Sequence, residues 1–309
     1  MVKREFTFPS ADGKTAIHAV EWLPEGAPRA VLQIAHGVSE YVLRYEDFAG
    51  YLTERGFAVV GNDHLGHGLS VADGAPRLYF GPKGSWNWVV EDMEQLRKLT
   101  HEKFPNLPYF LLGHSMGSFL TRTLLFRYPD AGLRAAVICG TGWQPAPVLA
   151  AGLALCGLEK LRLGETGRSK LLVNLMFGAY NRKFPDARTP NDWICSDPEV
   201  VAKYTADPLC GQDATIGLTR EMLRGIRMIQ RPANLQRMDK ALPVFFIAGR
   251  SDPVGNMGRG VEKTAAAFRA AGMQDVACKL YDGRHEILNE KNRQLVYDDV
   301  LAFYERHLD

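Results

Sequence analysis

Hydrophobic and polar residues alternate near the start of the chain in the way that a β-hairpin requires. Residues 5–8 (EFTF) and 16–22 (AIHAVEW) are predicted as its two strands, and residues 10–13 (SADG) as the turn between them. Beyond residue 26 the pattern changes to short apolar runs with almost no polar interruption. These runs lie at residues 30–35, 57–62, 109–113, 135–140, 243–249 and 276–281. Such runs are typical of parallel strands that are covered on both faces.

Between the early runs, apolar residues recur at helical spacing. Residues 45–55 place Phe48 and Leu52 on one face, and Gly56 follows where a helix-ending glycine is expected. Residues 87–104 carry a second, broader apolar stripe. Strands that alternate with helices predict an α/β fold with a mostly parallel central sheet and helices on both of its faces.

This alternation stops between residues 143 and 238. Helical segments and turn-forming residues fill the stretch, and it holds no apolar run of the strand type. The predicted helices are residues 148–158, 170–180 and 213–230. We therefore expect a sheet domain made of residues 1–142 and 239–309, with residues 143–238 inserted into it as a helical cap. A cap over an active site would be inserted at this place in the sheet.

The strongest chemical signal is the pentapeptide Gly113-His114-Ser115-Met116-Gly117. It follows the apolar run YFLLG and precedes a helical pattern, which is the strand–turn–helix context of a nucleophile elbow. A serine on such a tight, strained turn projects its hydroxyl above the strand ends, and only small residues two positions away permit the close approach. The helix that begins there directs its N-terminal amides at the reacting oxygen. We predict that Ser115 is the nucleophile.

A second signal is His36-Gly37-Val38, directly after the apolar run at residues 30–35. In folds with a nucleophile elbow, the loop after an early strand supplies one backbone N–H of the oxyanion hole, and the residue after the nucleophile supplies the other. The predicted donors are therefore the backbone amides of Val38 and Met116. The His36 ring is interpreted as structural, shaping this loop, in preference to a role in proton transfer.

Asp252 follows the apolar run at residues 243–249, where an acid that orients a catalytic histidine is expected. Such an acid must lie close to the base, partly dehydrated and ionised. The alternative is an ordinary Asx-turn, because Ser-Asp-Pro begins turns readily. Asp275 and Asp282 compete for the role, but the first precedes a strand and the second lies only three residues from the predicted base.

His285 follows the last apolar run on a loop that contains glycine, which lets the ring reach back over the sheet. It is the one histidine of eight that lies after the acid on a loop leaving a strand. The chain order Ser115, Asp252, His285 is the order that a fold with this elbow requires. Three separate signals in the required order are far more specific than any one of them.

The passage at residues 63–70 (DHLGHGLS) carries two histidines three residues apart, His64 and His67. They lie on a Gly-rich turn after a strand, with no further group of metal-ligating residues nearby in the sequence. We interpret the passage as a structural turn and expect no metal site.

Composition narrows the possible partners. The net charge is +2, from 37 basic and 35 acidic residues spread along the chain, which gives no electrostatic case for nucleic acid. The opening residues lack the pattern of a secretory signal, and no apolar run is long enough to span a bilayer. The five cysteines are scattered and odd in number, as in a protein of a reducing compartment. We expect a cytoplasmic protein.

With these motifs in view, the sequence resembles the monoacylglycerol lipase and lysophospholipase branch of the α/β-hydrolases. The resemblance covers nearly the whole chain, and the segments that carry it are residues 36–70, 113–118, 192–209, 249–254 and 283–290. Residues 192–209 lie in the predicted cap and look like the cap of monoacylglycerol lipases, in contrast to that of epoxide hydrolases or peptidases. In one departure, Ser39 replaces the second glycine of the His-Gly-x-Gly that family members often show.

The resemblance implies hydrolysis of a carboxylic ester with one acyl chain and a small polar head, without any cofactor. Ser115 would attack the carbonyl, and His285 would take its proton. His285 would then protonate the departing alcohol and activate water for deacylation. The apolar cap segments would wall an acyl channel or dock transiently on a membrane surface, although core packing explains them equally well. No obligate protein partner is implied.

Other functions stay open. A general carboxylesterase or thioesterase would share the triad and differ in pocket depth. A relative that only binds a ligand is a different class, but such proteins usually lose a triad member and this chain keeps all three. A peptidase or a cofactor-free haloperoxidase fits the fold alone, since fold does not fix function.

Overall fold

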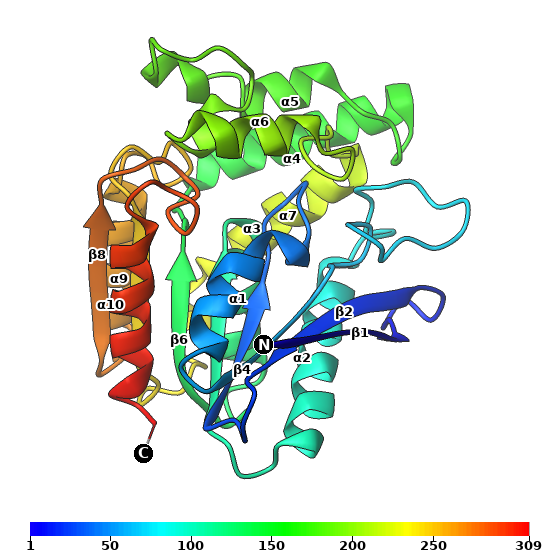
Figure 1. Cartoon of the computed structure of the whole chain (residues 1–309). Helices are drawn as coiled ribbons and strands as arrows, with labels where there is room; N and C mark the ends of the chain where they lie inside the picture. The colour runs from blue at the N-terminus through cyan, green and yellow to red at the C-terminus, as the bar shows by residue number, and fades with distance from the viewer. Residues whose placement is uncertain (309) are drawn as a thin grey trace.

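The computed structural model describes residues 1–308 and contains an eight-stranded sheet in the order β1-β2-β4-β3-β5-β6-β7-β8 (Figure 1). β1 and β2 form the predicted antiparallel hairpin, and β2 also pairs antiparallel with β4. All the remaining neighbours are parallel. The strands are β1 (Val2–Pro9), β2 (Ala16–Leu23), β3 (Ala30–Ala35), β4 (Phe57–Asn62), β5 (Tyr109–His114), β6 (Leu133–Cys139), β7 (Val244–Gly249) and β8 (Val276–Tyr281).

The burial of the parallel strands explains their apolar sequences. Every residue of β3, β4, β5 and β7 is buried, because helices cover both faces of this part of the sheet. β8 lies at the edge and is partly exposed over most of its length. The parallel strands all point the same way, so the loops that leave their carboxyl ends gather on one side of the sheet.

Helices pack on the two faces of the sheet as predicted. On one face α1 (Glu46–Thr53) and α10 (Arg293–Glu305) bury their apolar residues. On the other face α2 (Trp86–Lys103), α3 (Met116–Arg127) and α9 (Arg259–Ala270) contribute to a second, larger core. The fold is therefore the α/β architecture that the sequence predicts.

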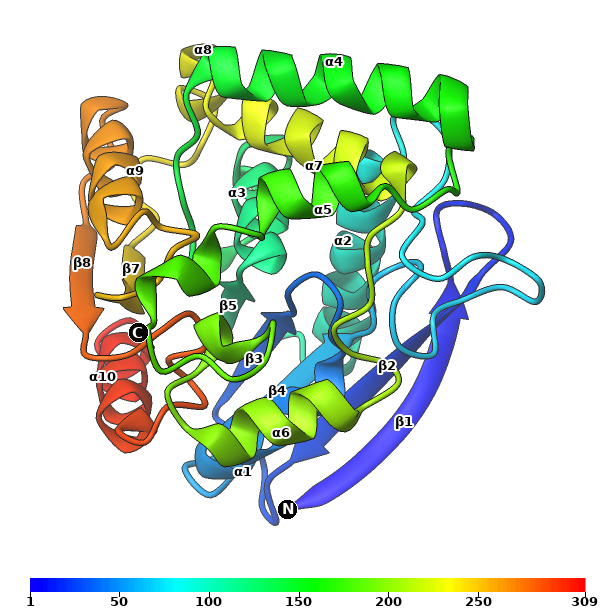
Figure 2. The same ribbon diagram turned by 90° about the horizontal axis from the view of Figure 1, so that it is seen from above.

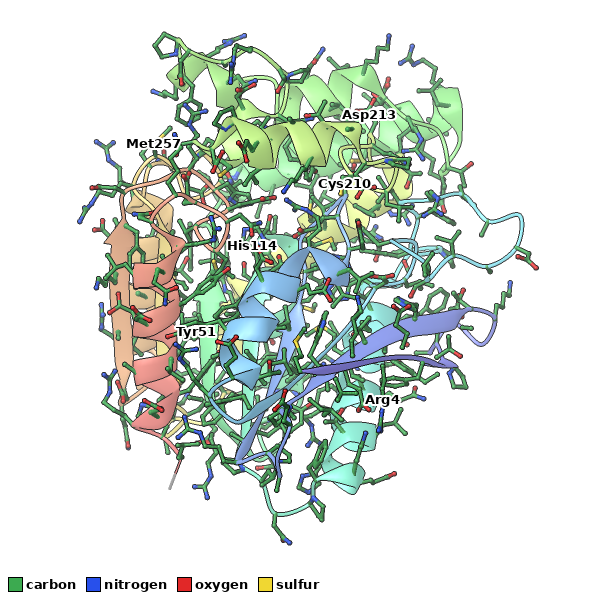
Figure 3. The ribbon with its side chains drawn as sticks, in the orientation of Figure 1. Arg4, Tyr51, His114, Cys210, Asp213 and Met257 are labelled. Atoms are coloured by element: carbon green, nitrogen blue, oxygen red, sulfur yellow. The ribbon has the colours of Figure 1, made fainter. Side chains whose placement is uncertain are left out.

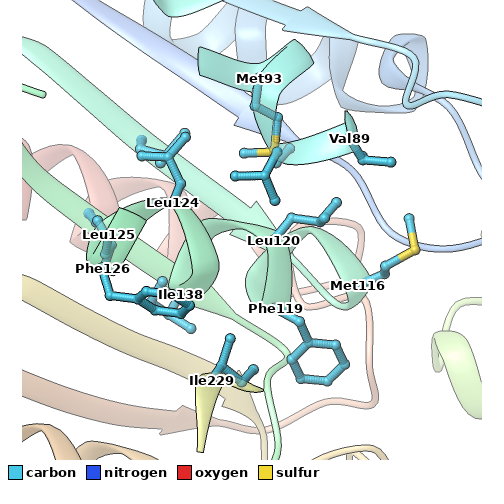
Figure 4. Close-up of a cluster of buried hydrophobic side chains, with 14 of the residues drawn as sticks. Val89, Met93, Met116, Phe119, Leu120, Leu124, Leu125, Phe126, Ile138 and Ile229 are labelled. Carbon is cyan, nitrogen blue, oxygen red and sulfur yellow. The ribbon is translucent and has the colours of Figure 1, made fainter. Parts of the chain in front are cut away.

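The helix that carries the predicted nucleophile is anchored deep in this larger core. Leu120 and Leu124 of α3 pack near Val89 and Met93 of α2 and near Ile138 of β6 (Figure 4). Burying one such side chain stabilises the fold by roughly 1.5–3 kcal/mol. That is as large as the cost of one strained backbone residue, about 1–3 kcal/mol, so this packing is strong enough to hold a strained turn at the start of α3.

The chain between β6 and β7 forms a layer of helices above the carboxyl ends of the parallel strands (Figures 1 and 2). α7 packs against α4 and also against α3, which ties this layer to the sheet. Residues 143–238, all of which the structure describes, contain no strand. The elements are α4 (Ala146–Leu163), α5 (Lys170–Met176), η2 (Tyr180–Lys183), η3 (Asp192–Ile194), α6 (Pro198–Ala206), α7 (Ile216–Ile229) and α8 (Pro232–Leu235).

One predicted helix is wrong in its extent. The pattern predicts a continuous helix over residues 170–180, but α5 ends at Met176 and Tyr180 begins a separate 3-10 turn. Gly178 lies in the interruption, and glycine loses more conformational entropy in a helix than any other residue. Among the helices of residues 1–308, none has the length and apolar character needed to cross a membrane.

Candidate active site

Ser115 occupies the sharp turn between β5 and α3, with φ 54° and ψ −121°. A positive φ strains any residue with a β-carbon, and a nucleophile elbow has this strained form. Both flanking glycines are required by close approach. A β-carbon on Gly113 would collide with the backbone of Gly117, and one on Gly117 would collide with the carbonyl of Ala35. The glycines therefore allow the turn to sit against the neighbouring strand.

The predicted oxyanion loop lies directly beside this serine. A β-carbon on Gly37 would lie 3.0 Å from the β-carbon of Ser115. Within the described residues, the N–H groups of Val38 and Met116 donate no hydrogen bond to another protein group. Two backbone donors beside the serine are thus free to receive an oxyanion, as the oxyanion-hole prediction requires.

Hydrogen bonds on both sides hold the Gly37 peptide in place. Nδ1 of His36 donates to the Gly37 carbonyl at 2.7 Å, and the His64 N–H donates to Nε2 of His36 at 2.8 Å. Burial lowers the pKa of His36, which favours the neutral ring that this pattern needs. Ser39 has φ 59°, a conformation that favours glycine, and its hydroxyl donates to the Gln212 carbonyl. Hydrogen bonds of His36 and His64 therefore hold one side of the loop, and the Ser39 hydroxyl joins its other side to the inserted layer.

Asp252 and His285 meet above the carboxyl ends of the strands, on the same side of the sheet as Ser115. Nδ1 of His285 lies 2.9 Å from Oδ2 of Asp252, whose side chain is fully buried. The two groups are close, but they are not aligned as a hydrogen bond; catalytic contacts are often aligned only once a substrate is bound. Oδ1 of Asp252 accepts the Val254 N–H, so the Asx-turn that competed as an interpretation is present as well.

The competing acids lie elsewhere. Asp282 is exposed and faces Arg250, and Asp275 lies 3.6 Å from His307. Neither carboxylate contacts His285 among the contacts of residues 1–308. Asp252 is therefore the acid that the fold brings to the predicted base.

A buried network of charges, which the sequence did not reveal, surrounds these residues. Arg44 binds Glu286 through two hydrogen bonds of 2.7 Å and Glu40 through one of 2.6 Å. Glu40 also accepts the Gly37 N–H and lies 3.3 Å from Nδ1 of His114. The network thus connects the oxyanion loop, the residue before Ser115 and the residue after His285.

Opposing effects set the protonation of this network. Burial alone would raise the pKa of Glu40, but the charge of Arg44 and the contact with His114 lower it well below its ordinary value. Burial likewise lowers the pKa of His114, but its hydrogen bond and charge attraction to Glu40 outweigh burial and leave it raised. The carboxylate of Glu40 is therefore ionised and available to hold the Gly37 N–H.

Ser115 and His285 line a cavity of about 660 Å³ under the inserted layer. This volume lies in the range of pockets that bury one small ligand. His114 lies at the upper ends of the strands, with Asp213 and Cys210 above it (Figure 3). The apolar part of the wall comes mainly from α4, α5 and α7: Leu149, Leu172, Leu175, Met176, Met222 and Ile226.

His64 and His67 are buried beneath the oxyanion loop. The rings of His36 and His64 lie 4.1 Å apart, and burial lowers the pKa of His67 to about 3. Residues 1–308 contain no group of three or more potential metal ligands arranged to hold an ion. This turn contributes neutral rings that support the loop above it.

The strand order, the elbow after β5 and the helical layer inserted after β6 define the class of α/β-hydrolases. Within this class the chain belongs to the family described as serine aminopeptidase S33, whose pattern matches residues 26–292.

Relatives with known names agree with this class. A monoacylglycerol lipase of Mycolicibacterium smegmatis is 30% identical over 99% of this chain and 98% of its own length. A monoglyceride lipase of Mus musculus is 25% identical over 87% of this chain and 79% of its own. The crystal structure of a thermostable carboxyl esterase from Bacillus coagulans, in complex with glycerol, superimposes with a TM-score of 0.91 at 30% identity, over the full length of both chains. The chain is a carboxylic ester hydrolase of the monoacylglycerol lipase-like branch.

Proposed function

We propose that this enzyme hydrolyses esters of single acyl chains, monoacylglycerols above all, through an acyl-enzyme on Ser115. His285 is the general base and Asp252 orients it. The amides of Val38 and Met116 form the oxyanion hole. Ser115, His285, Val38 and Met116 line one cavity, and the buried Asp252 lies beside His285; these groups follow four different strands, which supports the assignment.

The proposed reaction assigns each step to one of these groups. Ser115 attacks the ester carbonyl while His285 takes the hydroxyl proton, and the two amides stabilise the negative charge on the oxygen. His285 next gives its proton to the leaving glycerol. A water molecule, activated by the same ring, attacks the acyl-enzyme and releases the fatty acid. The carboxylate of Asp252 stabilises the imidazolium form of His285 in both halves of the reaction.

The apolar wall of the cavity is the observation that favours a lipid ester. Side chains such as Leu172 and Met222 surround the space next to the serine, so an acyl chain would replace water there. Each buried methylene contributes up to about 0.8 kcal/mol, so a channel that holds several carbons favours long chains strongly. A peptide would need partners for its many polar groups. The buried carboxylates Glu40 and Glu286 are already paired with Arg44.

Exposed leucines on the inserted layer support a transient contact with a lipid surface. Leu158 and Leu161 of α4 are 64% and 86% exposed, and Leu171 and Leu175 of α5 are 53% and 63% exposed. Of these leucines Leu175 also lines the cavity, and apolar side chains that gather on an exposed surface are typical of an interaction site. We therefore propose that the enzyme binds reversibly to membranes that contain its substrate; its cytoplasmic location stays a prediction from the sequence.

A panel of esters that varies acyl length and headgroup tests this function. We expect monoacylglycerols with medium or long chains to be cleaved with higher kcat/KM than acetyl esters, and triacylglycerols to be cleaved poorly. Assays with and without micelles, together with aminoacyl anilides, separate the lipase from an esterase and from a peptidase. If acetyl esters are the best substrates, a general carboxylesterase replaces the lipase.

A further inference from the structure

We propose that Trp193, in the turn η3 of the inserted layer, is a positioning residue for His285. The inserted layer would then hold the base in its working orientation in addition to walling the acyl pocket. This inference rests on the proposed function, because it concerns the same histidine. It gives a role to the first residues of the passage 192–209, which lies far from Ser115 in the sequence.

His285 is packed between aromatic rings that come from two layers. Its ring centroid lies 4.7 Å from that of His114, on the sheet, and 5.1 Å from that of Trp193, on the inserted layer. Trp193 is itself held by Tyr180 at 5.0 Å and by Phe177 at 6.1 Å. The indole therefore cannot move aside freely, and it restricts the rotation of the imidazole. Its face also attracts the imidazolium that forms during attack.

The turn that carries Trp193 is joined to the histidine loop by hydrogen bonds. The N–H of Glu286 donates to the Ile194 carbonyl at 2.6 Å. The guanidinium of Arg284 donates to the carbonyls of Asp192 at 2.7 Å and Cys195 at 3.4 Å. Residues on both sides of His285 are thus bonded to residues on both sides of Trp193.

Glu290 adds a third connection between the same two segments. Its Oε1 accepts the N–H groups of Arg284 and Ser196, each at 2.8 Å, and its Oε2 accepts the hydroxyl of Ser196. Glu290 is buried, and hydrogen bonds to a buried carboxylate are among the strong ones. These hydrogen bonds join the turn and the histidine loop into one bonded unit.

The contact with Asp252 does not by itself fix the orientation of the His285 ring. Oδ2 of Asp252 lies 2.9 Å from Nδ1 of His285 but is not aligned with it as a hydrogen bond. The carboxylate alone therefore does not fix the plane of the ring in this structure. The rings that pack on the imidazole supply that restraint, and Trp193 is the one that the inserted layer provides.

Two substitutions of Trp193 separate positioning from pocket lining. In Trp193→Leu we expect kcat to fall about tenfold for an acetyl ester and for a long-chain ester alike, since small errors of placement cost one to two orders of magnitude. The rate of labelling by a fluorophosphonate should fall by a similar factor. Trp193→Phe keeps an aromatic face and should recover most of both rates.

Three further variants complete the design. Trp143→Leu is the matched control, because Trp143 lines the same cavity but packs beneath Lys263. It should change KM for long-chain esters more than for an acetyl ester, which is the response of a wall residue and differs from the equal fall in kcat expected of a positioning residue. Arg284→Met removes the bonds to the turn, and with them an ion pair to Asp186 of the inserted layer, without changing a side chain of the cavity wall. It should lower kcat as Trp193→Leu does, whereas Asp186→Asn, which weakens the ion pair alone, should not. The double variant of Trp193→Leu and Arg284→Met should lose little more than the worse single variant, because both act through His285.

The outcomes distinguish this inference from the proposed function. If Trp193→Leu folds normally by circular dichroism, is labelled at the wild-type rate and changes only KM for long chains, Trp193 is a wall residue and the inference is wrong. Additive losses in the double variant would also overturn it. If the wild type itself is not labelled and cleaves no ester, the proposed function fails instead.

Discussion

The sheet edge and the inserted layer build the site in different ways. At the sheet edge, Ser115, Asp252 and His285 each follow a strand whose position is set by hydrogen bonding to its neighbours. In the inserted layer, the cavity wall depends on helices α4, α5 and α7 meeting above the sheet, and several of their leucines stay exposed. Under the proposed function, the groups that break the bond follow the strands, whereas the choice of substrate depends on how a separate layer packs over them.

The first and largest expected effect concerns the strand ends. Ser115→Ala removes the nucleophile and should lower kcat by roughly five to six orders of magnitude, as loss of the serine does in a comparable triad. The hydroxyl makes no bond that the fold needs, so the circular dichroism spectrum should not change. A soluble chromogenic ester gives the rate. Residual activity within tenfold of wild type would assign the chemistry to another residue.

Two further substitutions, His285→Ala and Asp252→Asn, test the roles proposed for the residues that follow β8 and β7. We expect the first to cost several orders of magnitude and the second somewhat less, near 10⁴-fold, because the imidazole remains but is poorly oriented. Asp282→Asn is the matched control, since Asp282 is an exposed acid three residues from His285. It should retain wild-type kcat. A large loss of kcat in Asp282→Asn, together with full activity of Asp252→Asn, would show that Asp282 is the acid and that Asp252 is not.

The inserted layer should respond differently. Met176→Gln or Leu175→Gln places a polar group on the cavity wall, and should lower kcat/KM for a long-chain ester about tenfold while an acetyl ester reacts as before. Leu295→Gln, on α10 and also exposed, controls for a surface leucine remote from the cavity. Equal losses for short and long esters would mean that the layer does not select chain length.

Much of the sheet domain was predictable because its constraints are local. The apolar runs coincide with β3 and β4, since a strand covered on both faces must be apolar throughout. The elbow was predictable for a similar reason, because the steric demand for Gly113 and Gly117 falls within five consecutive residues.

Features built from distant residues could not be predicted in this way. Arg44 and Glu286 are 242 positions apart, and the four-residue spacing of Glu40 and Arg44 was the one local signal of their network. The contact of Trp193 with His285 joins two layers and has no sequence pattern of its own. The division of the chain into a core and a cap at residues 143–238 stays a prediction.

A smaller effect concerns the stability of the sheet domain, away from the cavity. Burial raises the pKa of Asp92 to about 7, although Ser10 and the Ala11 N–H donate hydrogen bonds to it. The folded state then keeps a proton that the unfolded state loses near pH 4, so the free energy of unfolding falls between about pH 4 and pH 7, by up to roughly 4 kcal/mol. Asp92→Asn should remove this fall.

Urea unfolding at pH 5 and pH 8 measures this effect directly. The wild type should lose more stability than Asp92→Asn between these two values, while kcat of the folded enzymes stays equal. Equal losses of unfolding free energy in the two proteins would show that a group other than Asp92 causes the pH dependence.

The most direct test of the division between the two regions is the site of covalent modification. Treatment of the wild type with a fluorophosphonate, followed by digestion and mass spectrometry, should give one adduct on the peptide that contains Ser115. Ser115→Ala should give none, and Met176→Gln should give the same adduct at nearly the same rate. An adduct on another serine, or one that persists in Ser115→Ala, would contradict the assignment of bond cleavage to the strand ends.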